Sequence, residues 1–240
     1  MTESEWTYND NAWEMLEFLN ARCSERKFRL FGAWCCRRTW HLFTDTSSRL
    51  AVEVAERYVD RLATQIDLKQ AKRQAELVVA AIERECESGF DMYLEGYLDW
   101  SEHHGWRCSL EVARAAAKIA QRGGVMATAQ QVWSHLLSAL GNDSDVSKTF
   151  RCNAADALRD IVGNPFCEKH LEPYWLEWRN GTIPRLASTI YEDQRFDLFP
   201  ILSDALQEAG CTQREMLDHC TSKKMHVRGC WVVDLLLRKD

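Results

Sequence analysis

Apolar side chains recur every three or four residues along most of this chain, the spacing that places them on one side of an α-helix. Within residues 47–64, for example, Leu50, Val54 and Tyr58 follow one another at intervals of four. No stretch alternates convincingly between apolar and polar residues, and no Asn-Gly turn joins two β-branched runs. The pattern therefore predicts an all-α protein of about nine to eleven helices, arranged as an irregular multi-helix bundle or an α-solenoid-like stack.

Start and stop signals divide this pattern into segments. We expect helices over residues 10–21, 24–43, 47–64, 67–86, 109–122, 125–139 and 146–162, with further helices that start near 182, 200, 212 and 229. Asp67 with Gln70, and Thr212 with Glu215, have the spacing of a capping box. No Pro-rich or Gly/Ser-rich linker interrupts the chain. We therefore expect a single domain over residues 1–240, with possible halves of 1–140 and 141–240 that share an interface.

The charge and the cysteine content narrow the class of protein. The 240 residues carry a net charge of −6, which argues against general nucleic-acid binding because clustered Lys and Arg hold a phosphate backbone. No apolar run approaches the roughly 18 residues that span a membrane. The start, MTESEWTYND, lacks the features of a signal or transit peptide. We expect a soluble, cytoplasmic protein whose ten cysteines are reduced and mostly packed in the core.

The most basic segment of the chain lies between residues 22 and 40. Much of one side of its predicted helix consists of Arg22, Arg26, Arg29 and Arg37, with Trp40 among them. Such a face could bind an anion or an acidic protein partner through charge-assisted hydrogen bonds and cation–π contacts. The alternative is a solvated face that pairs with acidic helices elsewhere in the chain.

The C-terminal quarter contains histidine and cysteine residues that could share one metal ion. A short helical hairpin would bring Cys211, His219, His226 and Cys230 within reach of one Zn²⁺, which takes four nitrogen or sulfur ligands. Their spacing, C-x7-H-x6-H-x3-C, matches no standard zinc finger. The alternative is structural: the cysteines pack in the core, His219 favours the dipole at its helix end, and His226 and Arg228 hydrogen-bond to loop carbonyls.

Asp234 interrupts the apolar run WVVDLLL at 231–237. A buried carboxylate is costly unless it is paired, so we expect Asp234 to form part of a polar core with Arg38 or Arg228 as its partner. A catalytic acid and an exposed helix edge are the alternatives.

Two further groups of charged residues have less specific patterns. Asp156, Arg159 and Asp160 lie late in one predicted helix and are interpreted as ion pairs or caps. The residues Glu95, Asp99 and His103 follow at intervals of four and could offer ligands to a metal, but the Glu-x-x-His spacing of di-iron bundles is missing. We expect this second group to be a solvent-facing stripe.

Two blocks of the sequence are similar to a known protein family. The first block contains FRLFGAWCCRRTWHLF and AVEVAERY, and the second contains GNPF, WRNGTIPRLASTIYED, FPILSDALQEAGC and HVRGCWVVDLLL. Over residues 1–60 and 152–240 the chain resembles a family of uncharacterised bacterial all-helical proteins. The resemblance implies a folded helical domain and brings no activity, cofactor or catalytic residue with it.

Common catalytic and cofactor motifs are absent from the sequence. The Walker, GxGxxG, HExxH, GxSxG and CxxC patterns do not occur. Together with the many helices, this favours a protein-binding or scaffolding role without catalysis or a cofactor, for a protein partner that the sequence does not identify. The alternative is a metalloprotein, with zinc as its metal, or a small-ligand enzyme, with a site near the C-terminus.

Overall fold

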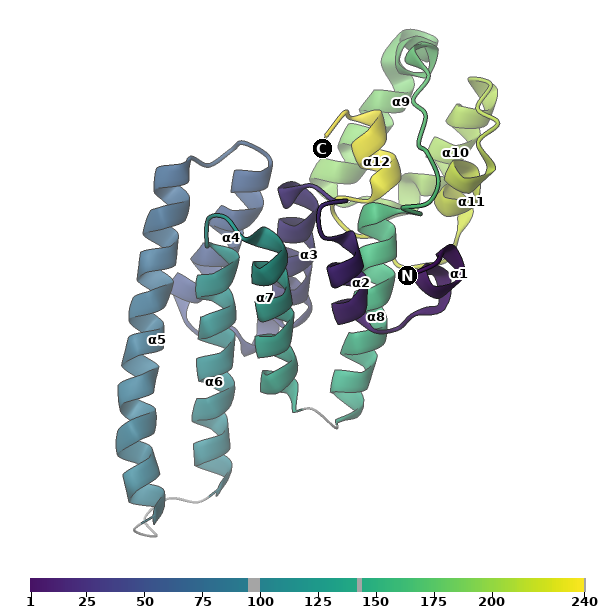
Figure 1. Cartoon of the computed structure of the whole chain (residues 1–240). Helices are drawn as coiled ribbons and strands as arrows, with labels where there is room; N and C mark the ends of the chain where they lie inside the picture. Colours follow the sequence, from purple (N-terminus) through teal and green to yellow (C-terminus); the bar gives the residue numbers. More distant parts are fainter. Residues whose placement is uncertain (95–99, 142–143, 240) are drawn as a thin grey trace. The chain divides into compact units, whose positions relative to one another are not determined.

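The described chain folds into helices, as the apolar spacing predicts. The computed structural model describes residues 1–94, 100–141 and 144–239, with side chains for 1–85, 105–141 and 144–239. These residues form twelve α-helices and two short 3-10 helices, and they contain no strand (Figure 1). The all-α prediction is confirmed. Helical segments that the sequence pattern did not predict include α1 (Glu3–Tyr8), although Thr2 and Glu5 form a capping box at its start, and residues 173–177, which precede a kink at 178–181.

The chain divides into two compact units that do not follow the predicted halves. Unit 1 consists of Met1–Lys27 and Ala155–Asp240, and unit 2 consists of Phe28–Ala154. The N-terminal segment groups with the C-terminal part because it contributes buried side chains such as Trp6. In addition, Arg159 donates hydrogen bonds to the main-chain oxygens of Trp6, at 3.0 Å, and of Asn9.

Unit 1 is built mainly from short helices that surround one apolar core. Its elements are α1, α2 (Ala12–Leu19), the start of α3 (Glu25–Arg38), the end of α8 (Asp145–Val162), α9 (Pro173–Asp193), η2 (Phe196–Leu198), α10 (Phe199–Glu208), α11 (Arg214–Thr221) and α12 (Trp231–Leu236). Helix α9 contacts α10 and α12, and α11 contacts the same two helices. Trp175, Phe199 and Met216 are among the large side chains that fill this core.

Unit 2 is built from longer helices. Its elements are the remainder of α3, η1 (Trp40–Leu42), α4 (Thr46–Val59), α5 (Gln65–Leu94), α6 (Trp100–Ile119), α7 (Val125–Leu140) and the start of α8. Figure 1 shows α5, α6 and α7 side by side, and α4 contacts both α5 and α6. Close approach is built in at Gly32 of α3, where a Cβ atom would lie 2.5 Å from the Cδ1 atom of Ile119.

Two predicted helix starts differ from the structure. Helix α5 begins at Gln65 because Thr64 and Asp67 exchange hydrogen bonds, so Asp67 closes a capping box and does not open one. The predicted box of Thr212 with Glu215 does not form. The N-cap of α11 is Gln213, whose side chain instead donates to the carbonyl oxygen of His170 at 2.7 Å.

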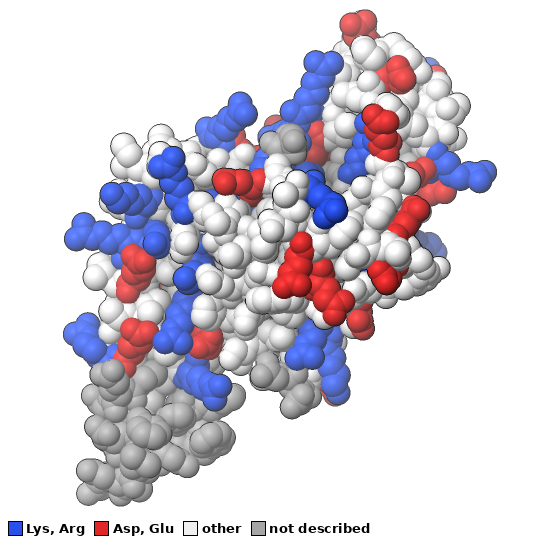
Figure 2. Space-filling model, viewed as in Figure 1, with Lys and Arg blue, Asp and Glu red and all other residues white. Residues whose placement is uncertain are grey.

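Two features of the described residues relate to the environment expected from the sequence: the charges on their surface and the lengths of their helices. Lys and Arg side chains are interspersed with Asp and Glu side chains on the face shown in Figure 2. None of the helices in the described part of the chain combines the length and the apolar character that a membrane span requires.

Candidate metal centre

Four potential metal ligands converge in unit 1. Asp160, His219, His226 and Cys230 each offer one ligand atom, and these atoms all lie within 4.8 Å of one another. They come from three separate places in the chain: the end of α8, the last turns of α11, and the segment between α11 and α12. Such convergence of two imidazoles, a thiol and a carboxylate is the donor chemistry of a zinc site.

Local backbone features bring these segments together. Helix α8 ends at Val162, and Gly163 follows with a φ of +72°, a conformation that favours glycine. A Cβ atom on Gly163 would lie 2.9 Å from the Trp231 ring, so the backbone that follows the C-terminus of α8 lies close to α12. Cys230 is the N-cap residue of α12, and His226 lies in the preceding loop.

Asp160 is the centre of the cluster. Its Oδ1 atom lies 2.8 Å from Nδ1 of His226 and 3.2 Å from Nε2 of His219, and its Oδ2 atom accepts the main-chain N–H of Val227 at 2.8 Å. The side chain is only 3% exposed. Burial acts to raise the pKa of Asp160, but hydrogen bonds and charges from the two histidines outweigh it and leave the pKa below its usual value.

Cys230 completes the cluster as a buried thiol. Its Sγ atom lies 3.1 Å from Nε2 of His219. Burial, and then the charge of Asp160, raises the pKa of Cys230 well above its usual value. Nucleophilic cysteines need a depressed thiol pKa and some solvent access, so the pair does not have the properties of a catalytic Cys–His dyad.

Aromatic rings hold the two imidazoles in place. The Phe199 ring stacks on His226 at a centroid distance of 4.0 Å and meets His219 edge-on at 6.1 Å. The indole Nε1–H of Trp231 donates to Nδ1 of His219 at 3.2 Å. Because Nδ1 accepts this bond, the proton of a neutral His219 lies on Nε2, which faces Asp160 and Cys230.

His226 contains a polar atom that the surrounding protein does not satisfy. Its Nδ1 atom faces Asp160, whereas its buried Nε2 atom has no hydrogen-bond partner among the residues that the structure describes. Buried polar atoms are nearly always paired, and leaving one unpaired costs about 1–3 kcal/mol. This atom is not the one that lies 2.8 Å from Asp160, so a metal bound through Nδ1 would leave Nε2 unpaired.

The four side chains fit a zinc ion in donor type and nearly in spacing. A tetrahedral zinc with bonds of ~2.0–2.3 Å separates its ligand atoms by roughly 3.3–3.7 Å. Three of the six separations are 2.8, 3.1 and 3.2 Å, and all six are within 4.8 Å, so a bound ion requires some ligand pairs to move apart and others to move closer. Three of the four sequence-predicted ligands are therefore together.

Cys211 is the predicted ligand that the structure does not bring into the cluster. It is buried, and Asp160 takes its place among the four ligands. Of the three residues interpreted as ion pairs or caps, Arg159 pairs with Asp156 at 2.9 Å, whereas Asp160 is buried and faces two histidines. A sequence signal was present: Asp160 lies between the apolar residues Leu158 and Ile161, as Asp234 lies within its own apolar run.

Asp234 forms a separate buried polar centre in unit 1. It is 1% exposed, and Arg26 binds both of its oxygens at 2.6 and 3.1 Å, while Lys27 also pairs with it. These cations are the partners in place of the predicted Arg38 or Arg228. Arg38 belongs to unit 2, and the Arg228 guanidinium lies over the Tyr191 ring at 5.0 Å.

The predicted arginine face is not one exposed surface. Arg26 pairs with the buried aspartate just described. Arg29 is buried and donates to the main-chain carbonyls of Ile119, the last residue of α6, and of Gln121, at 2.5 and 3.1 Å. Arg37 pairs with a glutamate on α4 at 2.5 Å and covers the Trp40 ring. Arg22 is exposed and lies over the ring of a nearby phenylalanine. Periodicity alone cannot separate arginines that reach inward from arginines that face solvent.

The remaining metal candidate of the sequence, Glu95 with Asp99 and His103, lies outside the residues whose side chains the structure describes. Comparisons of the chain with protein-family models, with curated proteins and with solved structures found no match. The resemblance to a bacterial helical family therefore stays a prediction.

Proposed function

We propose that this protein is a zinc-stabilised all-helical protein in which Asp160, His219, His226 and Cys230 hold one Zn²⁺. The observation that supports this most strongly is the environment of Asp160. Its carboxylate is 3% exposed, and no Lys or Arg of the described residues lies within ion-pair distance of it. Two imidazoles and one main-chain N–H are its partners, and a dication would compensate its charge where no guanidinium or ammonium group of the described chain does.

The burial of the ligands favours a structural role for the ion. Catalytic zinc sites usually keep one position open for water or substrate, whereas structural sites are closed by four protein ligands. Here four side chains converge, and their exposed fractions range from 1% to 18%. Zinc would tie α8 to α11, α12 and the loop between them, so metal binding adds directly to the free energy of folding.

The hydrogen bond from Trp231 opposes metal binding at His219. A histidine that binds zinc through Nε2 carries its proton on Nδ1, and it usually donates that proton to a neighbouring acceptor. In the structure Nδ1 of His219 instead accepts the indole N–H of Trp231. Zinc binding therefore displaces this hydrogen bond, and the indole acts as a competitor of the ion.

Metal analysis of the purified protein tests the proposal. We expect about one equivalent of zinc per chain. Cobalt provides a spectroscopic probe, since a tetrahedral Co²⁺ with a thiolate ligand gives a sulfur-to-metal charge-transfer band. Cys230→Ser should abolish this band, and Cys211→Ser is the matched control because Cys211 is equally buried in the same unit but lies outside the cluster.

Two results would overturn the zinc site. One is a protein that neither retains zinc nor binds added Zn²⁺ or Co²⁺, with a melting temperature unchanged by chelator. The other is a charge-transfer band that depends on Cys211 and not on Cys230, which would return the ligand set to the one expected from the sequence. The protein-binding or scaffolding role expected from the sequence is independent of both results and stays a prediction.

A further inference from the structure

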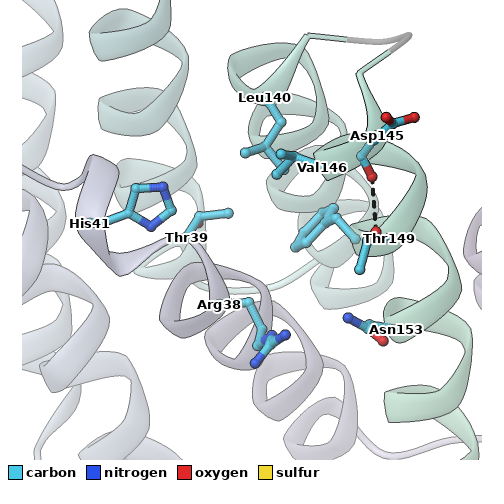
Figure 3. Close-up of a pocket in the computed structure, with 9 residues that line it drawn as sticks. Arg38, Thr39, His41, Leu140, Asp145, Val146, Thr149 and Asn153 are labelled. Atoms are coloured by element: carbon cyan, nitrogen blue, oxygen red, sulfur yellow. Dashed lines mark hydrogen bonds between the residues drawn. The ribbon is translucent and has the colours of Figure 1, made fainter.

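Unit 2 contains a pocket that shares no residue with the proposed zinc site. Its volume is about 320 Å³, at the lower end of the range for small-molecule sites. Residues from the end of α3 and from η1 line one part, and residues from the end of α7 and the start of α8 line the other (Figure 3). A pocket of this size suits a ligand of roughly ten non-hydrogen atoms or slightly more.

Three polar side chains in this pocket have no partner in the described protein. Arg38, His41 and Asn153 line it, and none of them forms a hydrogen bond or ion pair with a described residue. Figure 3 shows Arg38 and Asn153 near each other, from α3 and α8. This sets Arg38 apart from Arg29 and Arg37 of the same helix, whose guanidinium groups are engaged with carbonyls or a carboxylate.

The other polar groups of the pocket are already engaged. The hydroxyl group of Thr39 donates to the carbonyl oxygen of Cys35 at 3.1 Å, and that of Thr149 donates to the carbonyl oxygen of Asp145 at 2.9 Å. The carboxylate of Asp145 is exposed and pairs with Lys148 at 3.3 Å, which offsets its charge. The polar groups of the pocket that remain available can therefore donate hydrogen bonds, and the charge of the Arg38 guanidinium is not paired with a described carboxylate.

An apolar surface lies beside these donors. The Phe150 ring is 5% exposed and packs against Trp34, and Leu140 and Val146 line the pocket with it. A ligand that contacts both the hydrogen-bond donors and this apolar surface has an anionic group and an apolar body. Arg guanidinium matches a carboxylate in a bidentate geometry, and an Asn amide adds one more donor.

We propose that this pocket binds a small carboxylate with an apolar body, its carboxylate held by Arg38 and Asn153 and its body against Phe150. His41 lines the pocket from η1. The site does not depend on the zinc proposal, because all its residues belong to unit 2.

Binding of benzoate to the full chain tests this inference, with benzamide and benzamidine as probes of the same shape but neutral or positive charge. We expect benzoate to bind with a dissociation constant at or below about 10 mM, the weak end of ligand efficiency for about nine non-hydrogen atoms. Benzamide should bind at least about tenfold more weakly, and benzamidine should not bind. Titration calorimetry or amide chemical shifts of residues in η1 and α8 report the affinity.

Matched variants place the binding in the pocket. Arg38→Gln should weaken benzoate at least about tenfold, as expected for the loss of a charge-assisted hydrogen bond. Arg107→Gln, at an exposed arginine of α6 outside the pocket, should leave the affinity unchanged. Three results would overturn the proposal. Benzoate and benzamidine could bind equally well, or benzoate could fail to bind at about 10 mM, the expected limit of its dissociation constant. The third result is a benzoate affinity that is unchanged in Arg38→Gln. Inorganic phosphate that binds more tightly than benzoate would overturn the requirement for an apolar body.

Discussion

Asp160 and Asp234 are both buried in unit 1, yet their charges are compensated in different ways. Asp234 lies against a guanidinium and an ammonium group, those of Arg26 and Lys27. Asp160 lies against two imidazoles, which carry charge only when protonated, and one main-chain N–H. One aspartate pairs with guanidinium and ammonium groups of the chain, and the other does not pair with either kind of group among the described residues.

The difference separates a structural ion pair from a candidate ligand site. Asp234 pairs with two cationic side chains of the chain, so its carboxylate has counter-charges without any added ion. Asp160 faces two imidazoles, a thiol and a main-chain N–H, and no guanidinium or ammonium group of the described residues. That arrangement accepts a dication, whereas the arrangement around Asp234 would repel one. Burial of a carboxylate is therefore less informative than the kind of group that faces it.

The largest expected effect is the loss of stability when the buried Asp234 carboxylate is removed. Asp234→Asn leaves Arg26 and Lys27 buried without a counter-charge, and we expect the free energy of unfolding to fall by about 3–5 kcal/mol. Urea denaturation measures it. Glu56→Gln is the control, because it breaks an ion pair whose arginine is 41% exposed and should cost at most about 1 kcal/mol. Equal costs for the two variants would contradict the role assigned to Asp234.

The next effect concerns Asp160 and requires two solution conditions. With zinc at about one hundred times its dissociation constant, removal of the ion by a chelator should lower the wild-type free energy of unfolding by about 2.7 kcal/mol. Asp160→Asn should lose most of this difference because it lacks the anionic ligand. Asp234→Asn should keep the full difference, although it is the less stable protein. If both variants respond to chelator like the wild type, Asp160 is not a ligand.

Removal of a single cation should have a smaller effect than removal of Asp234. In Lys27→Met the carboxylate keeps its two hydrogen bonds from Arg26, so we expect a loss of about 1.5–2 kcal/mol. Arg26→Met should cost more, because the Arg26 guanidinium also donates to the Tyr191 hydroxyl at 2.8 Å. Thermal or urea unfolding of the two variants ranks them, and the reverse order would mean that Lys27 is the main counter-ion.

The helical fold could be predicted from the sequence because each helix carries its own apolar period. Helix ends were less predictable, since Thr212 with Glu215 has the letters of a capping box but the structure places Gln213 at the cap. The two units were not predictable. Their grouping depends on contacts such as those of Arg159 with the main chain of Trp6, which join distant parts of the chain.

The candidate metal site could be predicted only in part, because a sequence pattern brings together residues that are close in the chain. His219, His226 and Cys230 are close in sequence, so a short hairpin brings them together. Asp160 was missed because it lies far upstream and beside Arg159, where local ion pairing is a sufficient explanation. The partners of Asp234 were missed because they lie more than two hundred positions away, at 26 and 27. Local patterns reveal which residue needs a partner and leave the identity of a distant partner open.

The smallest effect distinguishes zinc binding from a closed hydrogen-bond network at Asp160. Trp231→Phe removes the indole N–H that faces Nδ1 of His219 while keeping an aromatic ring at the position. If zinc displaces this hydrogen bond, the variant should bind zinc about three- to tenfold more tightly, since one such bond contributes ~0.5–1.5 kcal/mol. Competition with a chromophoric chelator measures the affinity.

Trp175→Phe is the control, because Trp175 is equally buried in unit 1 and its indole nitrogen has no hydrogen-bond partner among the described residues. Unchanged or weaker zinc binding in Trp231→Phe would show that His219 does not bind the ion through Nε2. Asp160 and the two histidines would then form a hydrogen-bonded clasp between α8 and the C-terminal helices.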